Sequence, residues 1–248
     1  MTTTTQPREL ARRVTVLLRA RGSPETAAQS RKFFKEEDVV SFHGLKTAQL
    51  REIERSFWEE VKGQWTLADA IELCEIMLPT KYLEEKGFAT SLFLRFKKDF
   101  SPGSMETIRE WLSKDYLNNW ASVDALCPAA FEELLGRYPK LAGKIKTWTA
   151  HPNRWVKRAS IVAFINLARH GRFLDAAYDV AERLFATDDD LIQKAMGWLL
   201  REAGKTDMER LERFLLTEGP RLPRTTLRYA IERFPDAKRR HLLAATRA

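Results

Sequence analysis

An indole and a carboxylate stand four residues apart in the stretch Trp120-Ala-Ser-Val-Asp124. On an α-helix this spacing places both side chains on one face. Both groups stabilise positive charge, such as the charge that develops on a sugar ring when a glycosidic bond breaks. The alternative is a core tryptophan, with Asp124 hydrogen-bonded to the end of a neighbouring helix.

A single carboxylate is enough for this chemistry when the leaving group needs no proton. A purine that is alkylated at N3 or N7 already carries a positive charge, so no second acid is required to expel it. The one carboxylate is then available to orient a water molecule. Asp124 is therefore the candidate catalytic residue, with Trp120 beside it.

A second segment sets cations on both sides of a tryptophan. Lys194, Trp198 and Arg201 follow one another by four and three residues, so they share a helical face away from the apolar stripe of the same segment. We expect Gly197 to let a ligand approach the backbone there. The alternative is that Trp198 spans an edge of the core and the two cations are ordinary surface charges.

A third segment clusters cations at the expected start of a helix. Arg154, Lys157 and Arg158 follow His151-Pro-Asn. A guanidinium binds phosphate oxygens bidentately, and cations at a helix N-terminus are disfavoured by the helix dipole, which favours an external anion as their partner. A salt bridge to an acidic side chain of the protein is an equally good alternative.

The net charge of +8 is concentrated in two regions. Residues 1–35 and residues 221–248 each carry a net charge of +6, and the residues between them carry −4. Two basic regions of this kind suit a polyanion such as nucleic acid, although solvated helix faces would give the same pattern.

The remaining composition predicts a cytoplasmic protein without a metal or another cofactor. Cys74 and Cys127 have no partner at metal-ligand spacing, and the four histidines are scattered, so we expect both thiols to be reduced core residues. No stretch resembles a signal peptide or reaches the length of a membrane span. At 248 residues the chain is long enough to bury a core without disulfides.

Apolar residues recur at steps of three and four almost everywhere, which predicts an all-α protein. Short turns between the helices indicate an α-solenoid of stacked antiparallel helix pairs, and an irregular bundle is the alternative. We expect one helical domain over residues 1–248, with residues 1–7 flexible. Pro128 is expected to end one helix and begin another, and Thr206-Asp-Met-Glu209 to form a capping box.

Four segments resemble the AlkD-type DNA alkylation repair glycosylases. They are Phe34-Lys35 with Gly44-Leu-Lys-Thr47, Asn119 to Asp124, His151 to Ala159, and Ile192 to Glu202. The resemblance covers roughly residues 10–240 in the same order, and the last segment is the most specific.

The resemblance implies a HEAT-like solenoid whose concave basic face binds duplex DNA and which removes N3- and N7-alkylated purines without flipping them. A solenoid that holds DNA needs no partner chain, so we expect a monomer. The resemblance also implies that Trp120 and Trp198 flank the deoxyribose of the lesion, that Asp124 stabilises the oxocarbenium ion and positions water, and that Arg158 holds the phosphate backbone. The other DNA-binding candidates are Arg154, Lys157, Lys194, Arg201 and Lys46. Contacts to phosphates predict binding that depends on salt and little on sequence.

The chain departs from the family pattern at three positions. Asn119 stands where some members have a second tryptophan, Ala121 where an acidic or polar residue is common, and Lys46 where at least one member has glutamine. These departures concern the preferred lesion. Two other functions are compatible with the sequence, a non-catalytic DNA-structure binder of the same family and a solenoid scaffold for a protein partner.

Overall fold

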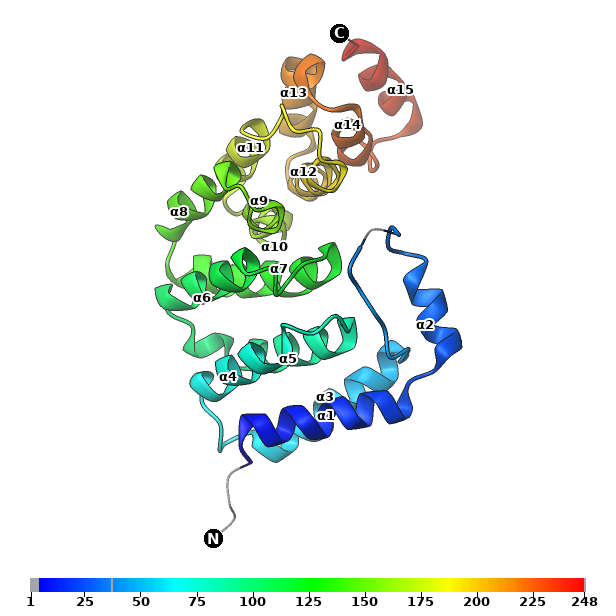
Figure 1. Ribbon diagram of the computed structural model, residues 1–248. Helices are drawn as coiled ribbons and strands as arrows, with labels where there is room; N and C mark the ends of the chain where they lie inside the picture. The colour runs from blue at the N-terminus through cyan, green and yellow to red at the C-terminus, as the bar shows by residue number, and fades with distance from the viewer. Residues whose placement is uncertain (1–4, 37, 248) are drawn as a thin grey trace. The chain divides into compact units, whose positions relative to one another are not determined.

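The computed structural model describes residues 5–36 and 38–247, which form helices joined by connections that are mostly short, except for the long segment between α2 and α3 (Figure 1). Within these residues the β-structure is one isolated bridge between Ser41 and Tyr82. Contacts divide the chain into two compact units, Met1–Leu126 and Cys127–Ala248, which are described in turn. The prediction that the chain forms a single domain stays a prediction.

The first unit is built from antiparallel helices around an aromatic and aliphatic core. Helix α4 packs on α1 and α5, and α5 also packs on α3. The rings of Phe93 and Trp111 join α5 to α6, with their centroids 5.0 Å apart. The helices are α1 (Pro7–Arg21), α2 (Pro24–Arg31), α3 (Thr47–Val61), α4 (Leu67–Met77), α5 (Leu83–Arg95), the 3-10 turn η1 (Lys97–Asp99), α6 (Pro102–Ser113) and the first turns of α7 (Trp120–Arg137).

Local capping signals set several helix starts in this unit. The Ser23 hydroxyl accepts a hydrogen bond from the Thr26 N–H, and proline occupies the first position of α2. Thr66 and Asp69 form a capping box at the start of α4. These are the starts that short polar side chains followed by an apolar periodic segment predict.

The second unit stacks its helices in two layers. Helices α9, α12 and α14 follow one another in one layer, and α8, α11 and α13 lie in the other (Figure 1). The helices are α8 (Leu141–Thr147), η2 (Trp148–Ala150), α9 (Arg154–Val162), α10 (Ile165–Arg169), α11 (Leu174–Glu182), α12 (Asp190–Ala203), α13 (Met208–Glu218), η3 (Gly219–Arg221), α14 (Arg224–Ala230) and α15 (Asp236–Ala245). This arrangement is an α-solenoid of helix pairs, as predicted.

Two predicted helix boundaries are wrong. Helix α7 runs from Trp120 to Arg137 and contains Pro128 in its interior. Proline removes one backbone hydrogen bond, but Cys127, Ala130 and Phe131 around it are fully buried, so packing holds the two halves of the helix together. The cap of α13 is Asp207, whose carboxylate accepts from the Arg210 N–H, and not Thr206.

The beginning of the chain is placed from Thr5 onward. The Thr5 carbonyl accepts a hydrogen bond from the Trp65 indole at 2.8 Å, and Pro7 begins α1. Residues 1–4 of the segment expected to be flexible lie outside the described residues. Among the helices that the structure describes, none has the length and apolar character needed to cross a membrane.

Candidate nucleic-acid interface

The first two turns of α7 present the indole and the carboxylate that the sequence singles out. Asn119 caps this helix, because its buried side-chain oxygen accepts from the Ser122 N–H at 2.9 Å and from the Ser122 hydroxyl at 3.1 Å. Trp120 and Asp124 follow on one helical face and are both half-buried. The predicted juxtaposition of the two side chains on one helix therefore rests on a well-defined helix start.

An aromatic cluster fixes the plane of the Trp120 ring. Phe34 stacks on the indole with ring centroids 5.2 Å apart and an interplanar angle of 21°. Phe42 packs against Phe34 in a tilted arrangement, with the two ring centroids 5.4 Å apart. Phe34 belongs to one of the segments that resemble the family, but the sequence suggests no role for this residue. Its contact with Trp120 spans 86 residues, so no local pattern indicates the contact.

The segment Gly44-Leu-Lys-Thr47 is a tight connection that leads into α3. Gly44 has a φ of +88°, and a Cβ atom at this position would lie 2.0 Å from the Ser23 carbonyl oxygen. The glycine thus permits a left-handed backbone pressed against the start of α2. Lys46 follows as the exposed N-cap residue of α3 and is available to solvent.

A cavity of about 310 Å³ lies beside the first turn of α7 in the first unit. Its wall combines apolar side chains with the first residues of three helices, and it is partly open to solvent. Ala121, Ser122 and Ala125 of α7, Phe42 and Glu84 are among its lining residues. The cavity is adjacent to the helical turn that carries Trp120, on another face of that helix.

The cationic cluster of α9 is held by the start of α12. Asn153 caps α9 by accepting from the Trp155 and Val156 N–H groups. The Arg154 guanidinium pairs with the Asp189 carboxylate at 2.8 Å, and the Arg158 guanidinium donates to the Leu191 carbonyl at 2.5 Å. At Arg154 the partner is therefore an acidic side chain of the protein, the second of the two alternatives that the sequence allows.

The two arginines and Lys157 differ in their exposure. Arg154 is exposed, Lys157 is half-buried, and Arg158 is only 5% exposed. Burial raises the pKa of the Asp189 carboxyl, but the hydrogen bond and charge of Arg154 outweigh it and leave that pKa lowered. Asp189 therefore stays ionised beside Arg154 at neutral pH, and the DNA-binding roles of the three cations stay predictions.

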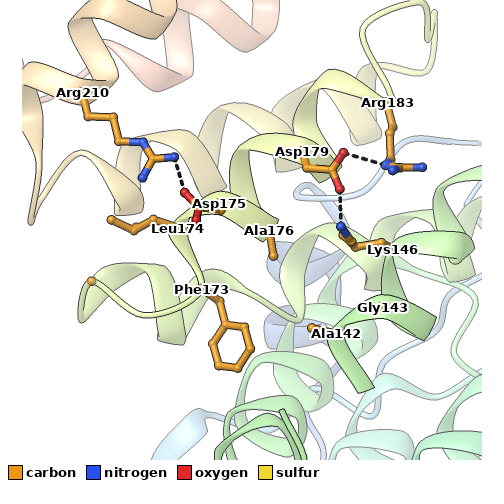
Figure 2. Close-up of a pocket in the computed structure, with 11 residues that line it drawn as sticks. Ala142, Gly143, Lys146, Phe173, Leu174, Asp175, Ala176, Asp179, Arg183 and Arg210 are labelled. Atoms are coloured by element: carbon orange, nitrogen blue, oxygen red, sulfur yellow. Dashed lines mark hydrogen bonds and ion pairs between the residues drawn. The ribbon is translucent and has the colours of Figure 1, made fainter. Parts of the chain in front are cut away.

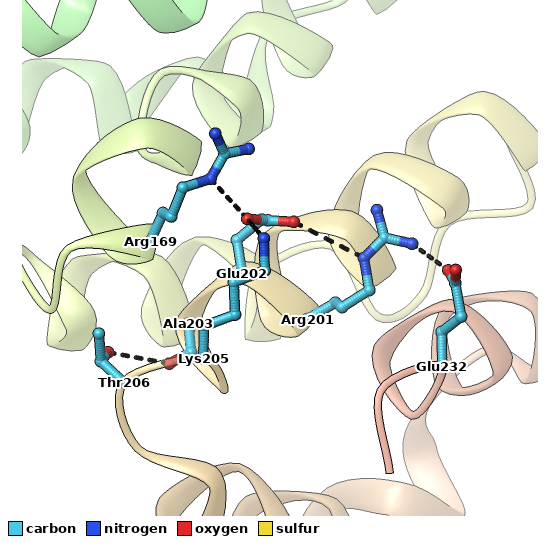
Figure 3. A network of polar contacts seen from close by, with 7 residues as sticks. All are labelled: Arg169, Arg201, Glu202, Ala203, Lys205, Thr206 and Glu232. Atoms are coloured by element: carbon cyan, nitrogen blue, oxygen red, sulfur yellow. Dashed lines mark hydrogen bonds and ion pairs between the residues drawn. The ribbon is translucent and has the colours of Figure 1, made fainter.

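The α12 cations also have acidic partners. Lys194 pairs with Asp190 at 2.7 Å, and Arg201 pairs with Glu232 while its Nε lies 3.7 Å from Glu202 (Figure 3). Trp198 is half-buried between these two positions of the helix. All of the predicted site residues of the second unit thus lie in the layer formed by α9, α12 and α14, whereas Lys46, Trp120 and Asp124 belong to the first unit. The sandwich of a sugar between Trp120 and Trp198 stays a prediction.

The expectation that a ligand approaches the backbone at Gly197 is wrong. This glycine is buried, and an added Cβ would lie 2.3 Å from the Tyr229 Cβ and 2.6 Å from the Thr226 carbonyl oxygen. The missing side chain therefore admits α14, which packs closely on α12.

A second cavity, of about 870 Å³, lies in the other layer of the second unit, along α8 and α11 (Figure 2). Its charged side chains are largely satisfied by one another. Asp179 pairs with Lys146 and Arg183 at 2.7 and 2.9 Å, and Asp175 pairs with Arg210 at 2.6 Å. These residues are distinct from the predicted site residues, so the cavity is not assigned to the candidate interface.

The cysteines are buried in the core, as predicted. Cys74 and Cys127 are both fully buried, and burial raises the pKa of the Cys74 thiol well above its usual value. Within the described part of the chain, no group of three or more histidine, cysteine and acidic side chains has the arrangement of a metal site.

The sequence profile of the DNA alkylation repair enzyme family matches residues 14–234. The match covers most of the chain, which therefore belongs to the DNA alkylation repair enzyme family. No match is found among curated protein sequences.

A solved structure supports the same fold. The chain is similar to a protein described as a predicted DNA alkylation repair enzyme from Enterococcus faecalis, with a TM-score of 0.75 and 19% sequence identity. The alignment covers 87% of this chain and 98% of that one. At this identity the similarity concerns the arrangement of helices.

Proposed function

We propose that this protein is a DNA glycosylase that hydrolyses the N-glycosidic bond of cationic N3- and N7-alkylpurines in duplex DNA. The observation that carries the proposal is the pair formed by Trp120 and Asp124 on the first two turns of α7. Membership of the DNA alkylation repair enzyme family supports a repair role and DNA as the partner.

The proposed mechanism uses electrostatic stabilisation. As the bond to the cationic base breaks, positive charge moves onto the deoxyribose, where the Asp124 carboxylate and the indole face of Trp120 stabilise it. Asp124 also orients the water molecule that attacks the sugar. The resemblance to the alkylation repair glycosylases supports a further role for Trp198 in contacting the deoxyribose, and the base leaves without being flipped into a pocket.

The cations of α9 and α12 are proposed to bind phosphates. Because Arg154, Lys194 and Arg201 have acidic partners in the protein, DNA binding exchanges these ion pairs for contacts to phosphates. Exposed ion pairs contribute little to stability, so the exchange costs little. Each phosphate contact that forms releases counterions, and the affinity should therefore fall steeply with salt.

The test is release of N7-methylguanine from methylated duplex DNA under single-turnover conditions. Asp124→Asn is expected to lower the rate at saturating enzyme by about 100-fold or more while changing the DNA dissociation constant little, because the carboxylate acts on charge present only in the transition state. Glu133→Gln, on the same helix, is the matched control and should behave as the wild type.

The outcomes separate the possible functions. An unchanged rate in Asp124→Asn would show that the assigned role is wrong. Tight binding to DNA with no base release by the wild type would favour the non-catalytic DNA-binding alternative.

A further inference from the structure

Three consecutive charged residues are buried at the start of α5. Glu84, Glu85 and Lys86 are 7%, 6% and 1% exposed. Charged side chains are seldom buried without specific partners, and each of these three has one outside its own helix. Glu85 contacts the ring of His43 at 2.8 Å, and Lys86 donates to the Leu78 and Tyr116 carbonyls.

Glu84 makes the most extensive of these contacts. Its carboxylate accepts three backbone hydrogen bonds, from the N–H groups of Gly44 at 2.8 Å, His43 at 3.1 Å and Leu45 at 3.3 Å. Three successive N–H groups that turn toward one anion form a nest, a concavity of the backbone that binds anions. The carboxylate therefore fixes the backbone of residues 43–45.

The residues on either side of this nest belong to the candidate interface. Phe42 precedes it and packs against Phe34, which stacks on Trp120. Lys46 follows it and is exposed at the start of α3. A shift of the nest would therefore move both the support of the Trp120 ring and a predicted phosphate contact.

We infer that Glu84 is a positioning residue for the Trp120 site, acting through the backbone nest at residues 43–45 and through Phe42 and Phe34. The inference deepens the proposed function and rests on it for its effect on base release. Glu84 itself is buried and is not assigned a contact with DNA.

The cavity beside α7 provides a direct test, because Glu84 forms part of its wall and the cavity is partly open to solvent. Glu84→Ala removes the carboxylate and leaves three N–H donors facing space that a small carboxylate can enter. The probe is acetate, compared with chloride at the same ionic strength so that salt effects on DNA binding cancel. Glu110→Ala, which removes an exposed glutamate from α6, is the matched control.

The expected result is a single-turnover rate for Glu84→Ala roughly tenfold below that of the wild type, since hydrogen bonds to a charged group are lost. Acetate should restore most of this rate, whereas the wild type and Glu110→Ala should not respond. A rate within about twofold of the wild type, or a loss that acetate does not relieve, would overturn the inference.

Two further measurements keep the test decisive. If Glu84→Ala does not fold, Glu84→Gln keeps the side-chain volume but turns an amide N–H toward one of the donors, and a wild-type rate in that variant overturns the inference. The fluorescence emission of Trp120 should change in Glu84→Ala and recover with acetate. This emission is obtained as the difference between the spectrum of each protein and that of its Trp120→Phe counterpart. This signal does not require catalysis, so it distinguishes failure of the inference from failure of the proposed function.

Discussion

Phe34 covers one face of the Trp120 ring, with centroids 5.2 Å apart and 21° between the planes. Trp120 is half-buried, so part of the indole remains accessible to a ligand. The stack also limits rotation of the side chain, so the aromatic surface next to Asp124 is formed before DNA binds. In the proposed reaction, pre-organisation of this kind would support catalysis because no reorganisation is needed as the charge develops.

Phe34→Ala should therefore slow base release more than it weakens DNA binding. Loss of one aromatic stack corresponds to about 1 kcal/mol, or roughly a five- to tenfold lower single-turnover rate. Phe33→Ala is the matched control, because the neighbouring Phe33 ring is 76% exposed. Equal rates for the two variants would show that the stack does not support the reaction.

Gly197→Ala should destabilise the second unit. The new methyl group would lie 2.3 Å from the Tyr229 Cβ and 2.6 Å from a backbone oxygen of α14, so the two helices would have to move apart. Overpacking of this kind lowers the free energy of unfolding by about 1–3 kcal/mol, as urea denaturation would measure.

Gly143→Ala is the matched control for this substitution. Gly143 lies in α8, and an added Cβ there would meet no atom within 4 Å. The exchange should raise stability by about 0.5–1 kcal/mol, because alanine favours the helix. A Gly197→Ala protein as stable as the wild type would contradict the close packing of α12 on α14.

Local signals in the sequence account for much of the fold. The helix starts at Ser23 and Thr66 follow from polar caps next to periodic apolar residues, and the pairing of Trp120 with Asp124 on one face follows from their spacing. The helix break predicted at Pro128 does not occur, because buried neighbours on both sides override the local cost of the proline. Tertiary packing of this kind leaves no mark on a short stretch of sequence.

The contacts that define the candidate site are mostly long-range. Arg154 pairs with Asp189, which lies 35 residues further along the chain, and Glu84 accepts hydrogen bonds from the backbone of residues about 40 positions earlier. The sequence shows that a cation at a helix start needs an anion, but not whether that anion is a phosphate or an aspartate. The same limit applies to Gly197, whose missing side chain serves a neighbouring helix and not a ligand.

Glu202 should make the free energy of unfolding depend on pH in the acidic range. Burial raises the pKa of this carboxyl, but hydrogen bonds from Lys205 and Arg169, at 2.6 and 2.7 Å, outweigh it and leave the pKa lowered (Figure 3). The unfolded chain therefore binds the proton first as the pH falls. The stabilisation from Glu202 is fully present at a pH above the ordinary carboxyl pKa. It is lost as the pH falls through the lower pKa that Glu202 has in the folded protein.

Glu202→Gln is expected to lower the free energy of unfolding by about 1–3 kcal/mol at pH 7. Its difference from the wild type should shrink as the pH falls below 4.5, the usual pKa of the group. Glu209→Gln, at a position that is 92% exposed, is the control and should match the wild type throughout. A difference that stays constant down to pH 3 would mean that the ion pairs of Glu202 do not stabilise the folded state.

Lys86 should have the opposite signature, a gain in stability at alkaline pH. Burial lowers the pKa of its ammonium from 10.5 to about 8, although the charge of Glu85 opposes this effect. Between these two values the unfolded chain holds a proton that the folded protein does not, so stability rises with pH in this range. The neutral amine still has two N–H groups for the Leu78 and Tyr116 carbonyls, which preserves the link between the end of α4 and the turn before α7.

Lys86→Met removes this titration and both hydrogen bonds. The free energy of unfolding of the wild type should therefore increase relative to Lys86→Met as the pH rises from 7.5 to 10, by up to about 3 kcal/mol. Lys114→Met removes an exposed lysine that pairs with Glu110, and subtracting its pH dependence corrects for the titration of other groups. A wild-type advantage that falls or stays level over this range would show that Lys86 keeps an ordinary pKa, and that its charge is accommodated by the two carbonyls at no cost.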